Sequence, residues 1–182
     1  MFLEPNIATV VAAIKIATDM VKEKLITKEV AVGRVRPVQI YESLLKNIVA
    51  EDLNNNTQVS SGLPAGPGAS CGSAVFTAEK AEALGKKGKK VILIREETSP
   101  EDIHGMHYSE GILTSRGGLT SHAALVARGW GKSCVVGCQD LTIDKSHKFA
   151  KIADKKIKEG DQITLNGSSG DIYIGGLRLF QN

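Results

Sequence analysis

TSRGGLTSHAALVARG, residues 114–129, passes from a strand pattern to a helix pattern through a pair of glycines. The apolar pair Ile112-Leu113 just before it is typical of the end of a buried strand, and Gly117-Gly118 predicts a turn. The alanine-rich run after Ser121 predicts a helix with a face of small residues. His122 is therefore expected in the first turn of that helix.

A histidine in this position can carry a phosphoryl group. The free backbone N–H groups and the positive end of the helix dipole favour a dianionic group at a helix N-terminus. Neutral imidazole is also a competent nitrogen nucleophile near neutral pH without a strong base beside it. The alternative is a hydrogen-bonded histidine at a helix start with no catalytic part.

The sequence around His122 resembles the phosphohistidine signature of the phosphoenolpyruvate-utilising enzymes, and within them the pyruvate, phosphate dikinase family. The resemblance covers nearly the whole chain and rests on GGLTSHAA (117–124), ARG (127–129), RGWGKSC (128–134), CVVGC (134–138), ETSPEDIHGMH (97–107) and GLPAGPGA (62–69). The chain departs from the pattern at Leu119 and Trp130, where Met is common.

Two other interpretations stay open. The chain is similar, less closely, to the carrier domains of phosphoenolpyruvate synthase, which usually has Cys before the histidine, and of enzyme I of the sugar phosphotransferase system, which usually has Thr-Ser after it. The residues that flank His122 distinguish these carrier domains from that of the dikinase family. The third interpretation is a non-enzymatic interaction module of the same fold with an unused histidine.

The family resemblance implies a function in two steps. His122 accepts a phosphoryl group that comes from ATP at one remote active site and passes it to pyruvate at another, reversibly from phosphoenolpyruvate. The overall reaction converts ATP, phosphate and pyruvate into AMP, pyrophosphate and phosphoenolpyruvate. The chain would then be a fragment, inactive alone, whose partners are an N-terminal ATP-binding domain and a C-terminal phosphoenolpyruvate/pyruvate barrel domain. Those domains would bind Mg²⁺, and the full-length enzyme would be a homodimer.

Several neighbours of His122 are candidates for supporting the phosphate. They are Gly117, Gly118, Thr120, Ser121 and Arg116. Thr120 and Ser121 also suit a helix cap, and Arg116 suits bidentate donation to phosphate better than Arg128, which lies nearly two helical turns beyond the histidine. The resemblance adds a regulatory candidate, because plant dikinases are switched off by phosphorylation of the threonine two places before the histidine, here Thr120.

Other motifs predict no further site. Cys134 and Cys138 have a spacing that does not suit zinc, and buried strand thiols are expected instead. His104 and His107 lie one helical turn apart without an acidic or thiol partner, so no metal site is predicted. The sequence GKS at 131–133 lacks the first glycine of a P-loop and follows a helix rather than opening one.

Composition predicts an ordinary soluble globular protein. The 182 residues are 42% hydrophobic, and the net charge is only +3 with a pI of about 8.7. The lysine cluster at 86–90 lacks interleaved aromatic residues, so nucleic-acid binding is not expected. No apolar run reaches the roughly 20 residues that span a bilayer. Three cysteines, an odd number, favour a reducing intracellular compartment. The family resemblance implies either the cytoplasm or an organelle such as a plastid or glycosome.

The pattern of short strands and helices predicts the fold class α+β, after a helical segment. The family resemblance implies that residues 1–57 are helices that link to a nucleotide-binding domain absent from this chain, and that residues 58–182 form a β/β/α swivelling phosphohistidine domain. The polar stretch at 54–57 is a candidate hinge. Short runs between glycines predict strands near residues 72–77, 90–95, 110–113, 134–137, 162–165 and 171–175.

Overall fold

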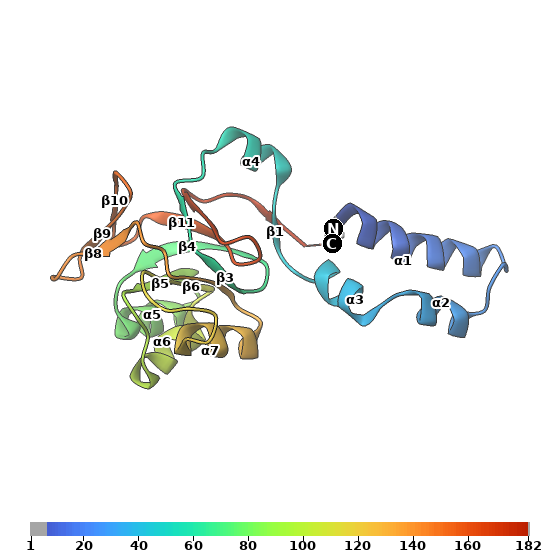
Figure 1. Cartoon of the computed structure of the whole chain (residues 1–182), viewed down its shortest axis with the longest axis horizontal. Helices are drawn as coiled ribbons and strands as arrows, with labels where there is room; N and C mark the ends of the chain where they lie inside the picture. Colours follow the sequence, from blue (N-terminus) through green and yellow to red (C-terminus); the bar gives the residue numbers. More distant parts are fainter. Residues whose placement is uncertain (1–6, 182) are drawn as a thin grey trace. The chain divides into compact units, whose positions relative to one another are not determined.

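The computed structural model describes residues 7–181 and divides the chain into two compact units (Figure 1). The first unit comprises Met1–Leu45 with Gln181–Asn182, and the second comprises Lys46–Phe180. The division therefore falls twelve residues before the boundary expected at 57/58, so residues 46–57 belong with the second unit. Among the described residues, no helix is both long and apolar enough to cross a bilayer.

The first unit consists of three helices, α1 (Ile7–Lys22), α2 (Lys28–Arg34) and α3 (Pro37–Ser43). The hydroxyl of Thr27 accepts a hydrogen bond from the Val30 amide at 3.3 Å and caps α2. Proline opens α3, where its missing N–H costs nothing. Helices were expected in this part of the chain.

An eight-stranded sheet forms the centre of the second unit, in the order β2-β12-β11-β4-β5-β6-β7-β3. Strands β4 to β7 are parallel, and the flanking strands pair antiparallel. The bounds are Ser60–Ser61 (β2), Leu63–Gly66 (β3), Ala69–Val75 (β4), Val91–Arg95 (β5), Gly111–Thr114 (β6), Ser133–Val136 (β7), Gln162–Asn166 (β11) and Asp171–Ile174 (β12). All six expected strands are present.

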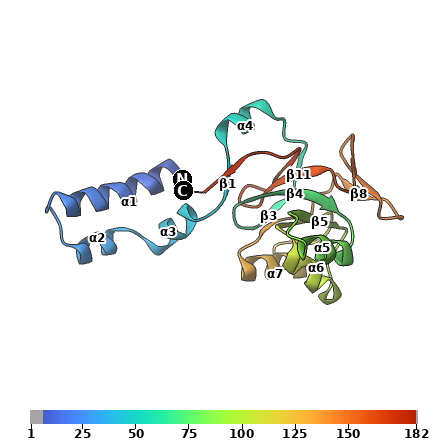
Figure 2. The same cartoon turned by 180° about the vertical axis from the view of Figure 1, so that it is seen from behind.

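Each face of this sheet is covered by a different layer. Helices α5 (Ala78–Gly85), α6 (Ile103–Tyr108) and α7 (His122–Trp130) lie side by side in both views (Figures 1 and 2). Their buried residues pack with Val91 and Leu93 of β5, whereas the alternate residues Ile92 and Ile94 pack with the opposite layer. That layer is a three-stranded antiparallel sheet, β8 (Leu141–Ile143), β9 (Phe149–Ile152) and β10 (Lys155–Lys158). The architecture is β/β/α, as predicted.

The sequence did not indicate the outer strands. In β9 and β10 lysines alternate with residues such as Ala150, Ile152 and Ile157, which are fully buried. The strands are four residues long and close to turns, so the alternation is too short to stand out from a charged loop.

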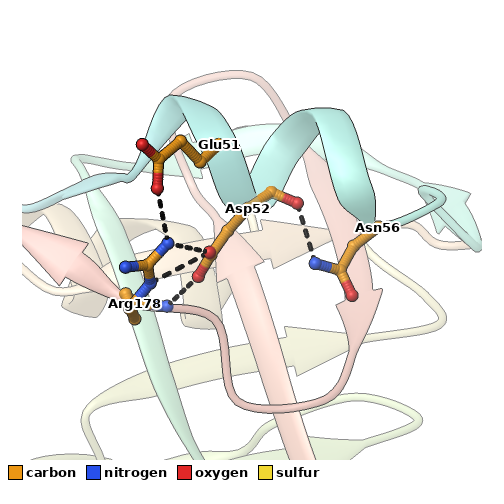
Figure 3. Close-up of polar contacts among 4 residues, drawn as sticks. All are labelled: Glu51, Asp52, Asn56 and Arg178. Carbon is orange, nitrogen blue, oxygen red and sulfur yellow. Dashed lines mark hydrogen bonds and ion pairs between the residues drawn. The ribbon is translucent and has the colours of Figure 1, made fainter.

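Residues 46–57 are held to the second unit at two places. Strand β1 (Asn47–Ile48) pairs with β13 (Leu179–Phe180), and Ile48 is buried in a small apolar cluster on the sheet. Helix α4 (Ala50–Asn55) is bound through the Arg178 clasp, which we define as Arg178 with Glu51 and Asp52 (Figure 3). These contacts place the segment with the carboxyl-terminal strand, to which no sequence pattern connects it.

The Arg178 clasp is a dense set of charged hydrogen bonds. The guanidinium donates to Asp52 Oδ1 from Nη2 at 2.7 Å and from Nε at 3.0 Å, and Nη2 also donates to Glu51 Oε2 at 3.0 Å. The backbone N–H of Arg178 donates to Asp52 Oδ2 at 2.6 Å. These hydrogen bonds hold the pKa of Asp52 below its usual value, because they stabilise the ionised carboxylate.

Candidate functional site

The loop between β6 and α7 has the strand–turn–helix geometry expected from residues 114–129. Gly117 adopts a φ of +102°, a backbone conformation that L-residues avoid, and a Cβ there would lie 2.9 Å from the Ser121 Cβ. The Ser121 N–H donates to the Gly118 carbonyl at 2.9 Å and closes a turn around residues 119 and 120. The Ser121 hydroxyl then accepts from the Ala124 amide at 3.4 Å and caps α7.

His122 is the first residue of α7 and is half-buried. Its Nδ1 lies 3.1 Å from the Thr98 hydroxyl oxygen. No hydrogen bond from the part of the chain that the structure describes reaches Nε2. When Nδ1–H donates to Thr98, the lone pair remains on Nε2, which is the tautomer that can attack phosphorus. The ring is therefore oriented through one nitrogen and open at the other.

Thr98 is a site residue that the sequence reasoning missed. It is only 5% exposed and lies in the loop after β5, whose residues pair in parallel with those of β6. Because parallel strands end at the same edge of a sheet, this loop meets the loop that carries His122. A signal was present, since Thr98 lies three residues after the predicted strand at 90–95 and directly precedes Ser99, a residue type that caps helices.

The loop that carries Thr98 is tied down at its far end. The Ser99 N–H donates to Asp102 Oδ2 at 2.9 Å in a capping box. The Asp102 carboxylate, 8% exposed, also lies 3.4 Å from Nη2 of Arg95 at the end of β5. These contacts hold the loop from which the Thr98 hydroxyl reaches His122.

The structure brings together most of the residues expected to support phosphate. Gly117, Gly118, Thr120 and Ser121 share one turn directly before the histidine. A Cβ on Gly118 would meet nothing within 4 Å, so the turn surface is open there. Thr120 is exposed and accessible to a modifying enzyme.

The two arginines occupy different surroundings from those expected. Arg116 is exposed and lines a pocket of about 260 Å³ with Arg95, Glu96, Glu97, Ile143 and His147, and His122 does not line that pocket. Arg128 reaches back along α7, and its Nη2 donates to the Leu119 carbonyl at 2.6 Å. The arginine that seemed too distant thus contacts the turn before His122.

The other titratable candidates are structural. Cys134 and Cys138 are buried, and desolvation raises the pKa of Cys134 to about 12, so its thiol stays protonated. His107 lies edge-on to Tyr108 and Trp130 with ring centroids 5.2 and 5.3 Å away. Among the described residues, no group of three or more His, Cys, Asp or Glu side chains is arranged to hold a metal ion.

Comparison with known proteins identifies relatives of this chain. Residues 87–170 match the family model "PEP-utilising enzyme, mobile domain". The chain is 50% identical over 163 residues to pyruvate, phosphate dikinase 1 of Arabidopsis thaliana, covering 90% of this chain and 17% of that protein. It is 48% identical over 167 residues to pyruvate, phosphate dikinase 2 of Oryza sativa subsp. japonica, covering 92% and 19%.

Among solved structures, an NMR structure of an enzyme I protein aligns with 47% of this chain and 30% of its own, at 25% identity and a TM-score of 0.35. The chain spans less than a fifth of the length of the dikinases it matches. The match covers 90% of this chain's own length, and the residues that match the family model include the glycine turn and His122. The chain belongs to the pyruvate, phosphate dikinase group of the phosphoenolpyruvate-utilising enzymes and contains their mobile domain.

Proposed function

We propose that this chain is the phosphocarrier part of a pyruvate, phosphate dikinase. The observation that carries the proposal is the state of the His122 ring, whose Nδ1 is held by Thr98 while Nε2 has no protein partner among the described residues. Such a ring can be phosphorylated at one nitrogen without giving up the contact that orients it. In the full-length enzyme it would take its phosphoryl group from ATP at one site and deliver it to pyruvate at another.

The chemistry at His122 is a displacement at phosphorus. The Nε2 lone pair attacks, an N–P bond forms, and the P–O bond to the leaving group breaks. The N-terminal amides of α7 and the helix dipole stabilise the added negative charge. In the second step the pyruvate enolate oxygen attacks phosphorus and His122 leaves as the neutral imidazole.

Mg²⁺ and both substrates would be held by other domains. The assignment rests on the family resemblance and is part of the proposal. The partners would be an N-terminal ATP-binding domain and a C-terminal barrel domain, in a homodimeric enzyme. Relatives named as chloroplastic support an organelle such as the plastid as its compartment.

Transfer between remote sites requires the carrier to move as a body. We propose that the helical unit links to the ATP-binding domain and that residues 58–182 contain the carrier. The chain crosses between the two contact-defined units near Leu45 and near Phe180, which favours these positions over the stretch at 54–57 as the hinge. The Arg178 clasp supports this choice, because it fastens Glu51 and Asp52, just before that stretch, to the second unit.

The test is phosphate loading from ³²P-labelled phosphoenolpyruvate in the presence of a dikinase barrel domain. We expect wild-type chain to acquire an acid-labile, base-stable label and His122→Asn to acquire none. Equal labelling of the two chains would disprove the carrier function.

Phosphorylation of Thr120 would oppose loading. A phosphate adds close to two negative charges two residues before the site that must receive another phosphate. Thr120→Glu should therefore load more slowly than wild type, whereas Thr120→Ser should load normally. A normal rate for Thr120→Glu would argue against regulation by charge at this position.

A further inference from the structure

Arg128 joins three parts of the fold that meet at the site. It lies on α7, and its Nη2 donates to the Leu119 carbonyl at 2.6 Å. Its Nη1 donates to the carbonyl of Ala65, in the edge strand β3, at 3.3 Å. One side chain thus connects the helix that begins with His122, the turn before it and the edge of the sheet.

The turn has few anchors of its own. Leu119 is 47% exposed, so its side chain is not fixed by burial. The space beside Gly118 is open, since a Cβ there would meet nothing within 4 Å. The hydrogen bond from the Ser121 N–H to the Gly118 carbonyl closes the turn but leaves its central peptide free to rotate.

The central peptide is the part that Arg128 controls. Type I and type II turns differ mainly by a flip of the peptide between their second and third residues, here Leu119 and Thr120. A hydrogen bond to the Leu119 carbonyl selects one orientation of that peptide. Because the carbonyl and N–H of a peptide point in opposite directions, the same contact sets the direction of the Thr120 N–H.

We propose that Arg128 is a positioning residue for phosphoryl transfer, which holds the turn before His122 in one conformation so that its amides are preorganised. The inference rests on the proposed carrier function of His122. Arg128 acts through the backbone, because its two terminal nitrogens donate to the carbonyl groups of Ala65 and Leu119. A planar guanidinium can bridge two acceptors, whereas the single ammonium of lysine lacks that fixed fork.

The test uses phosphoramidate, a small phosphoryl donor that needs no partner domain. Nε2 of His122 attacks phosphorus, the P–N bond of phosphoramidate breaks, and ammonia leaves. The rate is measured by ³¹P NMR for wild type, Arg128→Lys, Arg128→Ala and His122→Asn. Leu125→Ala is the matched control, because Leu125 lies on the same helix and is 57% exposed.

We expect both Arg128 variants to be phosphorylated about tenfold more slowly, the effect of losing one charged hydrogen bond. Leu125→Ala should keep the wild-type rate. Amide hydrogen exchange should rise at residues 118–121 and remain unchanged in the sheet. A purely structural role would instead raise exchange throughout the domain while the folded fraction reacts normally.

The outcomes separate this inference from the function on which it rests. Wild-type rates in Arg128→Lys and Arg128→Ala would overturn the positioning role, as would a normal rate in Arg128→Lys alone, since charge would then suffice. If Arg128→Ala does not fold, the rate of Arg128→Lys still decides whether Arg128 positions the turn. Equal labelling of wild type and His122→Asn would overturn the carrier function itself.

Discussion

Replacing Thr98 with valine removes one hydroxyl and little else, because the two side chains have nearly the same shape. The hydroxyl lies 3.1 Å from His122 Nδ1, and Thr98 is 5% exposed. A hydrogen bond of this kind contributes about 1 kcal/mol net, and the half-buried ring lets water replace part of it. We therefore expect Thr98→Val to lower the free energy of unfolding by about 1 kcal/mol.

The same loss should slow chemistry at Nε2. Without the contact, the tautomer that carries its proton on Nδ1 loses about 1 kcal/mol of stabilisation, which lowers its ratio to the other tautomer roughly fivefold. Phosphorylation by phosphoramidate should slow by about that factor, and the fraction of label on Nδ1 should rise. ³¹P NMR measures both quantities, because the two phosphohistidine isomers have separate signals.

Two variants control the experiment. Thr98→Ser retains the hydroxyl and should restore both the rate and the isomer ratio. Thr164→Val removes another buried hydroxyl, which donates to the Gly175 carbonyl at 2.8 Å and accepts from the Leu177 amide at 3.1 Å. It should lose stability without a change of rate. A wild-type rate and isomer ratio in Thr98→Val would refute the reasoning that Thr98 orients the ring.

Further predictions concern stability and accessibility. Gly105→Ala should lower the free energy of unfolding by about 2 kcal/mol in urea titrations, because its Cβ would lie 2.5 Å from the α5 backbone. Gly129→Ala is the control, because a Cβ there would meet no atom within 4 Å, and it should raise the free energy of unfolding by about 0.5 kcal/mol. Equal effects of the two substitutions would contradict the packing of α5 on α6. Iodoacetamide at neutral pH should modify partly exposed Cys71 well before Cys134, because burial raises the pKa of Cys134 to about 12. Mass spectrometry follows the two rates of modification, and similar rates would argue against the burial of Cys134. Arg178→Ala should lower the melting temperature at neutral pH. The clasp aspartate has a pKa below its usual 3.8, so its stabilisation is present above that pH and lost as the pH falls through the lower folded value. The melting temperatures of variant and wild type should therefore converge in acid, and a gap that persists there would exclude the ion pair as its cause.

The local chemistry of the site could be predicted because it depends on neighbours in sequence. Gly117 supplies a positive φ, Ser121 caps the helix, and His122 follows at its first position. Each of these effects acts within about one helical turn. The six principal strands were predictable for the same reason, since their apolar runs lie between glycine-rich turns.

Contacts between distant segments were beyond the reach of such rules. Thr98 meets His122 only because β5 and β6 pair in parallel. Arg128 was ranked below Arg116 by its separation along the helix, yet a long side chain that folds back contacts the turn. Residues 46–57 join the second unit through Arg178, more than 120 residues later in the chain.

The amino-acid order alone determined that a histidine would stand at the mouth of a helix behind a glycine turn, because backbone conformation and capping are short-range properties. Tertiary structure decided which nitrogen of that histidine is held, which arginine contacts the turn and where the second compact unit begins. Those outcomes depend on strand pairing and packing, which bring together residues whose separation in sequence says nothing of their distance in space.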